Sequence, residues 1–502
     1  MLRNLPQIVL PILLLVPGCG PTPPAAEPRA AAAPVTGPDT GGATITPHSP
    51  APTGAAHTDQ TLAQTTAPEG ARSQPASSAK TDTAGTNLAP AVPDRSQSIV
   101  DDAQLQGAGI RKLVGSHITL YTDLPAGPDV DPLVTDFDQA YPQWCEYFGA
   151  SQRGTQSWRA TACLMADKQK FLKVGLLPRN LPKFLHGYFR GDRIWIYDQE
   201  SDYYRRHLLL HEGTHAFMAA LLGSCGPPWY KEGMAELLAT HSQKNDRVTL
   251  DAFPADADDF VGWGRVRLVH EAIAAGRRLK MDDVLEYQAD AHTELEPYGW
   301  CWAVAAFLDG HPRYRERFRQ LATHVGAGNF NRQVLDRFAN DWPQLDEEWQ
   351  LFADRLEYGY DLQREAIDFR PGVPLPREGK TVRIAADRGW QSSGIELEAG
   401  RTYRLRASGS YQIAKGERPW LSDPGGVTIR YWEGRPLGVL LAAVHPEPFD
   451  SRSDSALLSP TIIGQEATLQ PTATGTLYLR VNDSPAELAD NAGTLEVRVS
   501  GE

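Results

Sequence analysis

The sequence predicts a disordered N-terminal tether, then an α+β region made of a small mixed sheet and a mostly helical half, then an all-β sandwich. Three observations support this order. Residues 20–97 are rich in Ala, Pro, Thr, Gly and Ser and hold few large apolar side chains, so they cannot bury enough surface to fold. Residues 98–370 mix β-branched runs with apolar residues at helical spacing. Residues 375–502 contain short alternating segments separated by Gly, Asp, Asn and Pro.

The extreme N-terminus has the features of an export signal. A basic start precedes an apolar run over residues 8–16, which is too short to cross a membrane as a mature helix. Cys19 directly after a glycine resembles a bacterial lipobox, although Pro17 is unusual inside that box. We therefore expect residues 1–19 to be a lipoprotein signal peptide, with a lipid on Cys19 that anchors the protein to the bacterial cell envelope. Gly20, in place of an aspartate that favours the inner membrane, points to the outer membrane, and an ordinary secretory signal is the alternative.

Within residues 98–370 the pattern changes from mixed to helical. Strands are predicted at 117–122, 160–165 and 193–198. Helices are predicted at 203–222, from Pro228 or Trp229 onward, at 298–308 and at 346–358. Ser201 or Asp202 can cap the first of these helices, and Gly223 can end it. Proline-rich residues 366–378 mark a domain boundary, because the folded length is too great for one typical core.

After this boundary the pattern is that of a sheet protein. Strands are predicted at 381–386, 394–397, 402–408, 426–431, 439–444, 476–481 and 494–499. Their residues alternate or are β-branched, and turn residues separate them. Two facing sheets would give each strand one buried and one exposed face, which is the pattern of a β-sandwich.

Residues 211–215, His-Glu-Gly-Thr-His, carry the clearest chemical signal. Histidines at i and i+4 lie on one face of a helix, about one turn apart, so both imidazoles can reach one metal ion. Glu212 lies beside them and can act as a general base on water. Catalytic zinc needs three protein ligands and an open position, so His211 and His215 predict a zinc site that lacks one ligand.

The next predicted helix supplies a carboxylate. Glu232 and Glu236 are at i and i+4 on one face of that helix. Glu232 is the expected third ligand, and Glu236 is expected to accept a hydrogen bond from the far nitrogen of a ligand histidine and so fix its tautomer. A surface helix with two solvated glutamates is the alternative. His207, one turn before His211, is expected at the rim of the pocket, with a fourth metal contact as the alternative.

This constellation resembles the gluzincin metallopeptidases, whose pattern is His-Glu-x-x-His, a short connection, and a helix that bears Glu-Gly-x-Ala-Glu. The resemblance covers residues 115–355 and implies a zincin-like fold. The roles that it implies are zinc ligation by His211, His215 and Glu232, general base catalysis by Glu212, and support of a ligand by Glu236. One departure is the connection 216–231, which is shorter than in the best-known members. Peptidase-like bacterial proteins of unknown function with the same short connection are a closer match.

The resemblance implies hydrolysis of peptide bonds. Zinc lowers the pKa of its bound water toward about 7, and Glu212 takes the proton and passes it to the leaving amine. Tyr298 is the candidate for the extra donor that stabilises the oxyanion, with packing of its ring against neighbouring tryptophans as the alternative. Residues 192–198 are expected to form an edge strand that pairs with an extended peptide. The alternative is an ordinary sheet strand, and both can hold.

Residues 375–502 resemble the galactose-binding, calcium-dependent lectin-like sandwich. The segments that carry this resemblance are 389–395, 437–441, 477–483 and 490–493. In the lectin the last loop supplies oxygen ligands to calcium, and Asp483, Asp490 and Asn491 match those positions. Hard oxygen atoms clustered in one loop suit calcium. A turn whose Asn and Asp side chains bond their own backbone is the alternative.

The net charge bears on the binding partners, and the cysteines bear on disulfide bonds. The net charge of −13 argues against nucleic acid. Four cysteines lie in the region with the metal motif, at positions Cys145, Cys163, Cys225 and Cys301. Export permits disulfides, and the three pairings and free thiols all stay open.

Two functions follow from these patterns. The first is a lipid-anchored, extracytoplasmic zinc metallopeptidase that acts on a protein or peptide substrate. The alternative is a surface lipoprotein that binds a glycan or another envelope polymer through its sandwich, with a zinc domain that is weakly active or not a peptidase.

Overall fold

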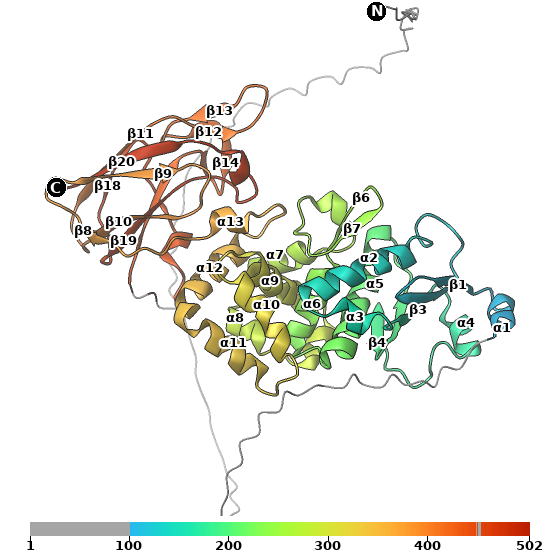
Figure 1. The fold of residues 1–502 in the computed structure, drawn as a ribbon. Helices are drawn as coiled ribbons and strands as arrows, with labels where there is room; N and C mark the ends of the chain where they lie inside the picture. Colours follow the sequence, from blue (N-terminus) through green and yellow to red (C-terminus); the bar gives the residue numbers. More distant parts are fainter. Residues whose placement is uncertain (1–100, 448, 450–452) are drawn as a thin grey trace, which may run out of the picture. The chain divides into compact units, whose positions relative to one another are not determined.

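The computed structural model describes residues 101–447, 449 and 453–502. The signal peptide expected at residues 1–19, its Cys19, and the tether expected at residues 20–97 lie outside the described residues. The described part has a mixed α/β region followed by a β-rich C-terminal region, which confirms the coarse fold prediction (Figure 1). Within these stretches, none of the helices is long and apolar enough to cross a membrane.

The mixed region begins with a five-stranded sheet in the order β1-β2-β3-β5-β4. Its elements are α1 (Asp102–Gly107), β1 (Arg111–Val114), β2 (Ile118–Thr122), α2 (Leu133–Tyr147), α3 (Gln152–Thr155), β3 (Ala160–Met165), α4 (Lys168–Lys173), β4 (Gly187–Arg190) and β5 (Arg193–Tyr197). Strands β2, β3 and β5 are parallel, whereas β1 and β4 run antiparallel to their neighbours. The three strands predicted in this region are present.

The prediction that residues 192–198 form an edge strand is wrong. Strand β5 lies inside the sheet, between β3 and β4, and β4 forms the edge. A tight turn at Gly191 folds β4 back antiparallel on β5, and the φ of +61° at this residue lies in the left-handed region that favours glycine. Strand β4 was not predicted, because it is short and lacks a clear alternation of apolar and polar residues.

The helical half follows the sheet. Its elements are α5 (Asp202–Phe217), the π-helix η1 (Met218–Leu222), α6 (Pro228–Ala239), β6 (Ser242–Lys244), β7 (Arg247–Thr249), α7 (Arg265–Ala274), α8 (Met281–Leu285), the 3-10 helix η3 (Ala289–Thr293), α9 (Glu296–Gly310), α10 (Arg315–Arg319), α11 (Phe330–Phe338), α12 (Trp342–Asp354) and α13 (Leu362–Glu365). Ser201 caps α5 as expected, because its hydroxyl accepts a hydrogen bond from the Tyr204 amide at 3.0 Å. Gly223 ends the run with a φ of +75°. The predicted helix thus has the expected ends, but its last turn is a π-helix.

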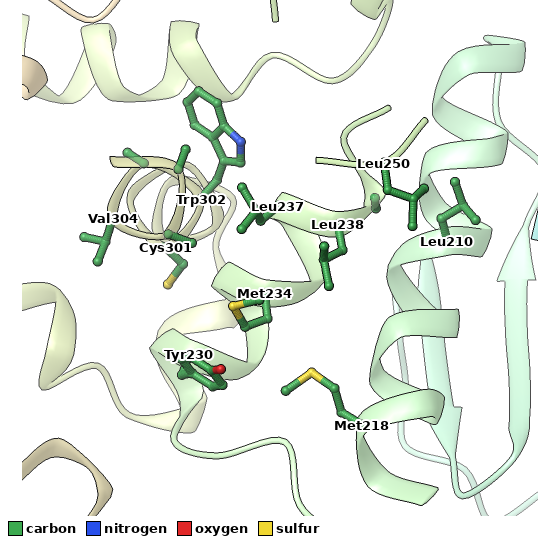
Figure 2. Close-up of a cluster of buried hydrophobic side chains, with 14 of the residues drawn as sticks. Leu210, Met218, Tyr230, Met234, Leu237, Leu238, Leu250, Cys301, Trp302 and Val304 are labelled. Carbon is green, nitrogen blue, oxygen red and sulfur yellow. The ribbon is translucent and has the colours of Figure 1, made fainter. Parts of the chain in front are cut away.

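Helix α6 packs against both α5 and α9. Its Met234, Leu237 and Leu238 are buried, and they lie among side chains from the two neighbouring helices, including Leu210 and Trp302 (Figure 2). This packing brings the two glutamates of α6 next to the histidines of α5.

Two glycines allow the helices to approach closely. A Cβ atom at Gly213 would lie 2.6 Å from the ring of Phe137 on α2, and one at Gly233 would lie 2.8 Å from the carbonyl oxygen of Cys301 on α9. Gly213 therefore leaves room for the aromatic side chains of α2 behind the motif helix.

The β-rich region contains two sheets and two short hairpins. Its strands are β8 (Val373–Pro374), β9 (Lys380–Ala385), β10 (Gln391–Leu397), β11 (Tyr403–Ser408), β12 (Tyr411–Ala414), β13 (Trp420–Ser422), β14 (Val427–Trp432), β15 (Arg435–Leu437), β16 (Leu440–His445), β17 (Thr461–Ile462), β18 (Glu466–Leu469), β19 (Gly475–Val481) and β20 (Thr494–Gly501). The sheet orders are β17-β16-β19-β10-β8 and β18-β11-β20-β9. Leu397 and Leu479 from the first sheet and Leu405 and Val497 from the second belong to one buried cluster. The strands predicted here are present, and the short β8, β12, β13, β15, β17 and β18 were missed.

Replacement of Gly233 by alanine tests the packing of α6. The added Cβ would meet the carbonyl oxygen of Cys301, so Gly233→Ala is expected to lower the free energy of unfolding by about 1–3 kcal/mol. Gly107→Ala is the matched control, because nothing lies within 4 Å of a Cβ at Gly107, and it should be neutral or slightly stabilising. Urea denaturation of both variants measures the difference, and equal stabilities would contradict the prediction.

Candidate metal centre

The structure brings the three predicted zinc ligands together. His211 and His215 lie on α5, and Glu232 lies on α6. The two Nε2 atoms of the histidines are 3.1 Å apart, and Oε2 of Glu232 lies 3.2 Å from His211 Nε2 and 3.3 Å from His215 Nε2. All three side chains are buried. They form a compact triangle of potential ligand atoms.

The dimensions and electrostatics of this triangle fit a zinc ion. Ligand atoms at tetrahedral zinc, with bonds of about 2.0–2.1 Å, are about 3.3 Å from one another. Nδ1 of His211 lies 3.2 Å from Oε1 of Glu236, which favours a proton on Nδ1 and leaves a lone pair on Nε2. Burial lowers the pKa of His211, but Glu232 and Glu236 outweigh burial and raise it to about 10, so the centre favours a positive charge.

Glu232 presents only one of its oxygen atoms to the histidines. Its Oε1 is paired with Lys231 Nζ at 2.8 Å. Although burial raises the pKa of Glu232, His215 and Lys231 hold it well below its usual range. Lys231 also lies 5.4 Å above the ring of Phe189, and that ring stacks on His215 at 4.9 Å. The carboxylate is therefore held in place from the side away from the two histidines.

Glu236 takes the supporting position that the sequence predicts for it. Besides His211, its carboxylate accepts two hydrogen bonds from Arg265, at 2.7 and 2.9 Å. His207 Nε2 lies 3.2 Å from Glu236 Oε2, and His207 Nδ1 lies 3.0 Å from the carbonyl oxygen of Ala239. His207, His211 and Glu236 form a second group with metal-ligand types, but Arg265 already occupies both oxygen atoms of Glu236. We therefore interpret His207 and Glu236 as residues that hold His211 in place through hydrogen bonds, and not as metal ligands.

A cavity of about 520 Å³ opens beside the cluster. His211, Glu212 and His207 line it from α5, and Tyr298 lines it from α9. His207 is thus a wall residue, outside the triangle of potential ligands. Burial raises the pKa of Glu212 to about 7, against the opposing effect of His211. The carboxyl group of Glu212 thus lies buried on the cavity wall, next to the potential metal ligands.

Tyr298 lies near the metal ligands. Its ring centroid is 6.2 Å from that of His211, and its hydroxyl makes a long hydrogen bond of 3.5 Å to the carbonyl oxygen of His292. Burial raises the pKa of Tyr298, so the hydroxyl keeps its proton and can donate it in a hydrogen bond. His292 also lines the cavity, with its Nε2 atom 3.4 Å from Sγ of Cys301.

Arg265, Lys231, Phe189 and His292 were missed from the sequence. Only Lys231 could have been found from the sequence, because it directly precedes the predicted ligand Glu232. The others reach the site from distant parts of the chain.

The predicted calcium loop brings only some of its residues together. Nδ2 of Asn491 donates to Oδ2 of Asp483 at 2.8 Å, and the Ser484 amide donates to the other carboxylate oxygen. Oδ2 of Asp490 accepts a hydrogen bond from the Lys415 amide at 3.3 Å. Among the described residues, Oδ1 of Asn491 and Oδ1 of Asp490 are buried and lack a hydrogen-bond partner.

Part of this loop binds other segments of the chain. The hydroxyl of Ser484 donates to Glu357, and the carbonyl oxygen of Pro485 accepts from the Asp361 amide at 3.1 Å. The backbone next to the predicted ligands is thus already engaged, which restricts how a large ligand can approach it.

The cysteines that the sequence left open are free thiols. This holds for the four that lie in the described part, Cys145, Cys163, Cys225 and Cys301. Three are buried, and Cys225 is half-buried.

Comparisons with known proteins give a similarity to solved structures but not to a protein family. No protein-family model matches the chain, and no curated protein is similar to it. A solved structure described as "EclA N-terminal domain; PllA-like lectin" is similar at 23% identity and a TM-score of 0.19, over 24% of this chain and 95% of that chain.

Zinc binding should depend on the triangle of ligands. Purified protein is expected to hold one zinc ion per chain after dialysis, and His211→Ala or Glu232→Gln should lose it, because each removes one of three ligands. His324→Ala, at a histidine outside the cavity, is the control. Elemental analysis gives the zinc content, and an undiminished content in His211→Ala would contradict the assignment.

Proposed function

We propose that the protein is a membrane-anchored, extracytoplasmic zinc-dependent metallopeptidase with a gluzincin-like, zincin-type catalytic domain. The observation that carries the proposal is the convergence of His211, His215 and Glu232 to within 3.1–3.3 Å, next to Glu212 on the wall of a cavity. Two imidazoles and one carboxylate are a ligand set of catalytic zinc in peptidases. Export and anchoring through Cys19 enter the proposal as sequence-based predictions.

In the proposed mechanism, Glu212 accepts and then releases the proton. Zinc, held by His211, His215 and Glu232, would supply Lewis-acid activation of water and of the substrate carbonyl. The Glu212 carboxylate would orient the attacking water and accept its proton. The same group would then pass the proton to the departing amine, and its burial favours the protonated form that this step needs.

Tyr298 and β4 are the groups placed to act on the substrate. The hydroxyl of Tyr298 is held only by a 3.5 Å contact, so it can turn to donate to the carbonyl oxygen on which negative charge develops. In the described part, β4 has a strand neighbour on one side only, and its Gly187 and Tyr188 line the cavity. Its other edge can pair with the backbone of an extended peptide.

Glu212→Gln separates metal binding from catalysis. The variant is expected to keep its zinc and to lose hydrolysis by about 10²–10⁴-fold in kcat, because the amide cannot accept the proton. Glu271→Gln, at an exposed glutamate paired with Arg267 on α7, is the control and should behave as the parent. The assay follows cleavage of a quenched fluorescent peptide library alongside elemental analysis. Full activity of Glu212→Gln would exclude Glu212 as the base.

A second candidate function is a surface lipoprotein that binds calcium, and through it a glycan or another envelope polymer, with a lectin-like β-sandwich. The observation that favours it is the pair of buried, unpartnered oxygen atoms of Asp490 and Asn491, close in sequence to the carboxylate of Asp483. Oxygen atoms that lack a donor suit a hard cation such as calcium. In this case the metal centre would be weakly active or would serve a different purpose.

Calcium titration of the full chain tests the second candidate. Calcium at millimolar concentration is expected to raise the Tm of the parent protein and not that of Asn491→Ala, because binding to the folded state stabilises it. Asn329→Ala, in the helical half, is the control and should respond as the parent does. A glycan array with and without calcium then separates the two functions. The absence of any glycan signal under both conditions would count against the binding function.

A further inference from the structure

We infer that Gly187 is a positioning residue for Glu212, an inference that rests on the proposed hydrolytic function. Gly187 is the first residue of the edge strand β4 and lines the cavity. A Cβ atom at this position would collide with Oε1 of Glu212 and would lie 3.0 Å from its Cγ and 3.1 Å from its Cδ. The carboxylate of Glu212 therefore lies directly against the backbone of β4, in space that any other residue at position 187 would fill.

The backbone conformation of Gly187 does not itself require glycine. Its φ lies outside the left-handed region, in contrast to Gly191 in the following turn, and it pairs in regular antiparallel register with Ile196. An L-residue can adopt this extended conformation without strain. The missing side chain thus matters for the space that it leaves, and Glu212 is the group that occupies that space.

The contact matters because no hydrogen bond to a described residue fixes the Glu212 side chain. Its position therefore depends on packing and on the less directional attraction of His211 and Lys231. Phe189, two residues after Gly187, shares the same face of β4, and its ring stacks on His215 at 4.9 Å. One face of the edge strand thus contacts both the proposed base and a proposed ligand.

Gly187→Ala tests the inference through activity and metal content. The alanine should displace the Glu212 carboxylate while the three ligands stay in place. We expect kcat to fall by about 10²-fold, as for a displacement of about 1 Å, with KM nearly constant and zinc content unchanged. Gly326→Ala is the matched control, since Gly326 is exposed and nothing lies within 4 Å of its Cβ position. An unchanged kcat, or a loss of zinc, in Gly187→Ala would overturn the inference.

A stability measurement tests the same contact without reference to hydrolysis. In the parent protein, Gly187→Ala should lower Tm by about 2–4 °C, because Glu212 must move. In a Glu212→Ala background the same change meets empty space, so Tm should stay constant or rise slightly. Equal Tm shifts in both backgrounds would overturn the inference. A parent protein that binds zinc but cleaves no peptide would instead overturn the proposed function, and the Tm comparison would still decide the contact.

Discussion

The buried carboxylate of Glu236 is the interaction on which the arrangement of the centre depends, because it joins three helices. It accepts two hydrogen bonds from Arg265 on α7 and lies 3.2 Å from both His207 and His211 on α5. Although burial raises the pKa of Glu236, Arg265 and His207 hold it well below the usual range. Removal of Arg265, which bonds both oxygen atoms, would leave a buried carboxylate without its main partner, at a cost of about 3–5 kcal/mol. The carboxylate therefore fixes both the relative placement of the helices and the orientation of His211.

Close packing of the helices makes this network of charges attainable. Glycine at position 213 allows α5 to approach the aromatic side chains of α2, and glycine at position 233 allows α6 to approach the backbone of α9. These contacts fix α5 against α2 and α6 against α9, so the two helices that carry the histidines and glutamates are each held from behind. Interiors at this density transmit displacements instead of absorbing them, so changes in the packing behind the helices would reach the ligand atoms.

The parts of the site that the sequence predicts are those whose geometry is local. His211 and His215 share one helix face, and Glu232 and Glu236 share another, as helical spacing predicts. The expectation that the two faces meet came from the resemblance to a known pattern. The coarse order of a mixed region before a β-rich region follows from composition and alternation. Arg265 comes from a different helix, and no pattern near it in the sequence indicates its two bonds to Glu236. The edge strand was assigned wrongly for the same reason, since the turn at Gly191 decides which strand is outermost. Tertiary contacts, which no window of the sequence contains, determine these features.

The pairing of Lys231 with Glu232 has a consequence for the choice of ion. Because the ammonium group lies 2.8 Å from one carboxylate oxygen, Glu232 would offer a metal ion only its other oxygen. Alkaline-earth ions depend on several oxygen ligands, and the triangle of His211, His215 and Glu232 holds one carboxylate. Ions of intermediate softness bind imidazole nitrogen strongly, and two of the three ligands are imidazoles. A centre of the kind proposed would thus favour ions of intermediate softness over magnesium and calcium.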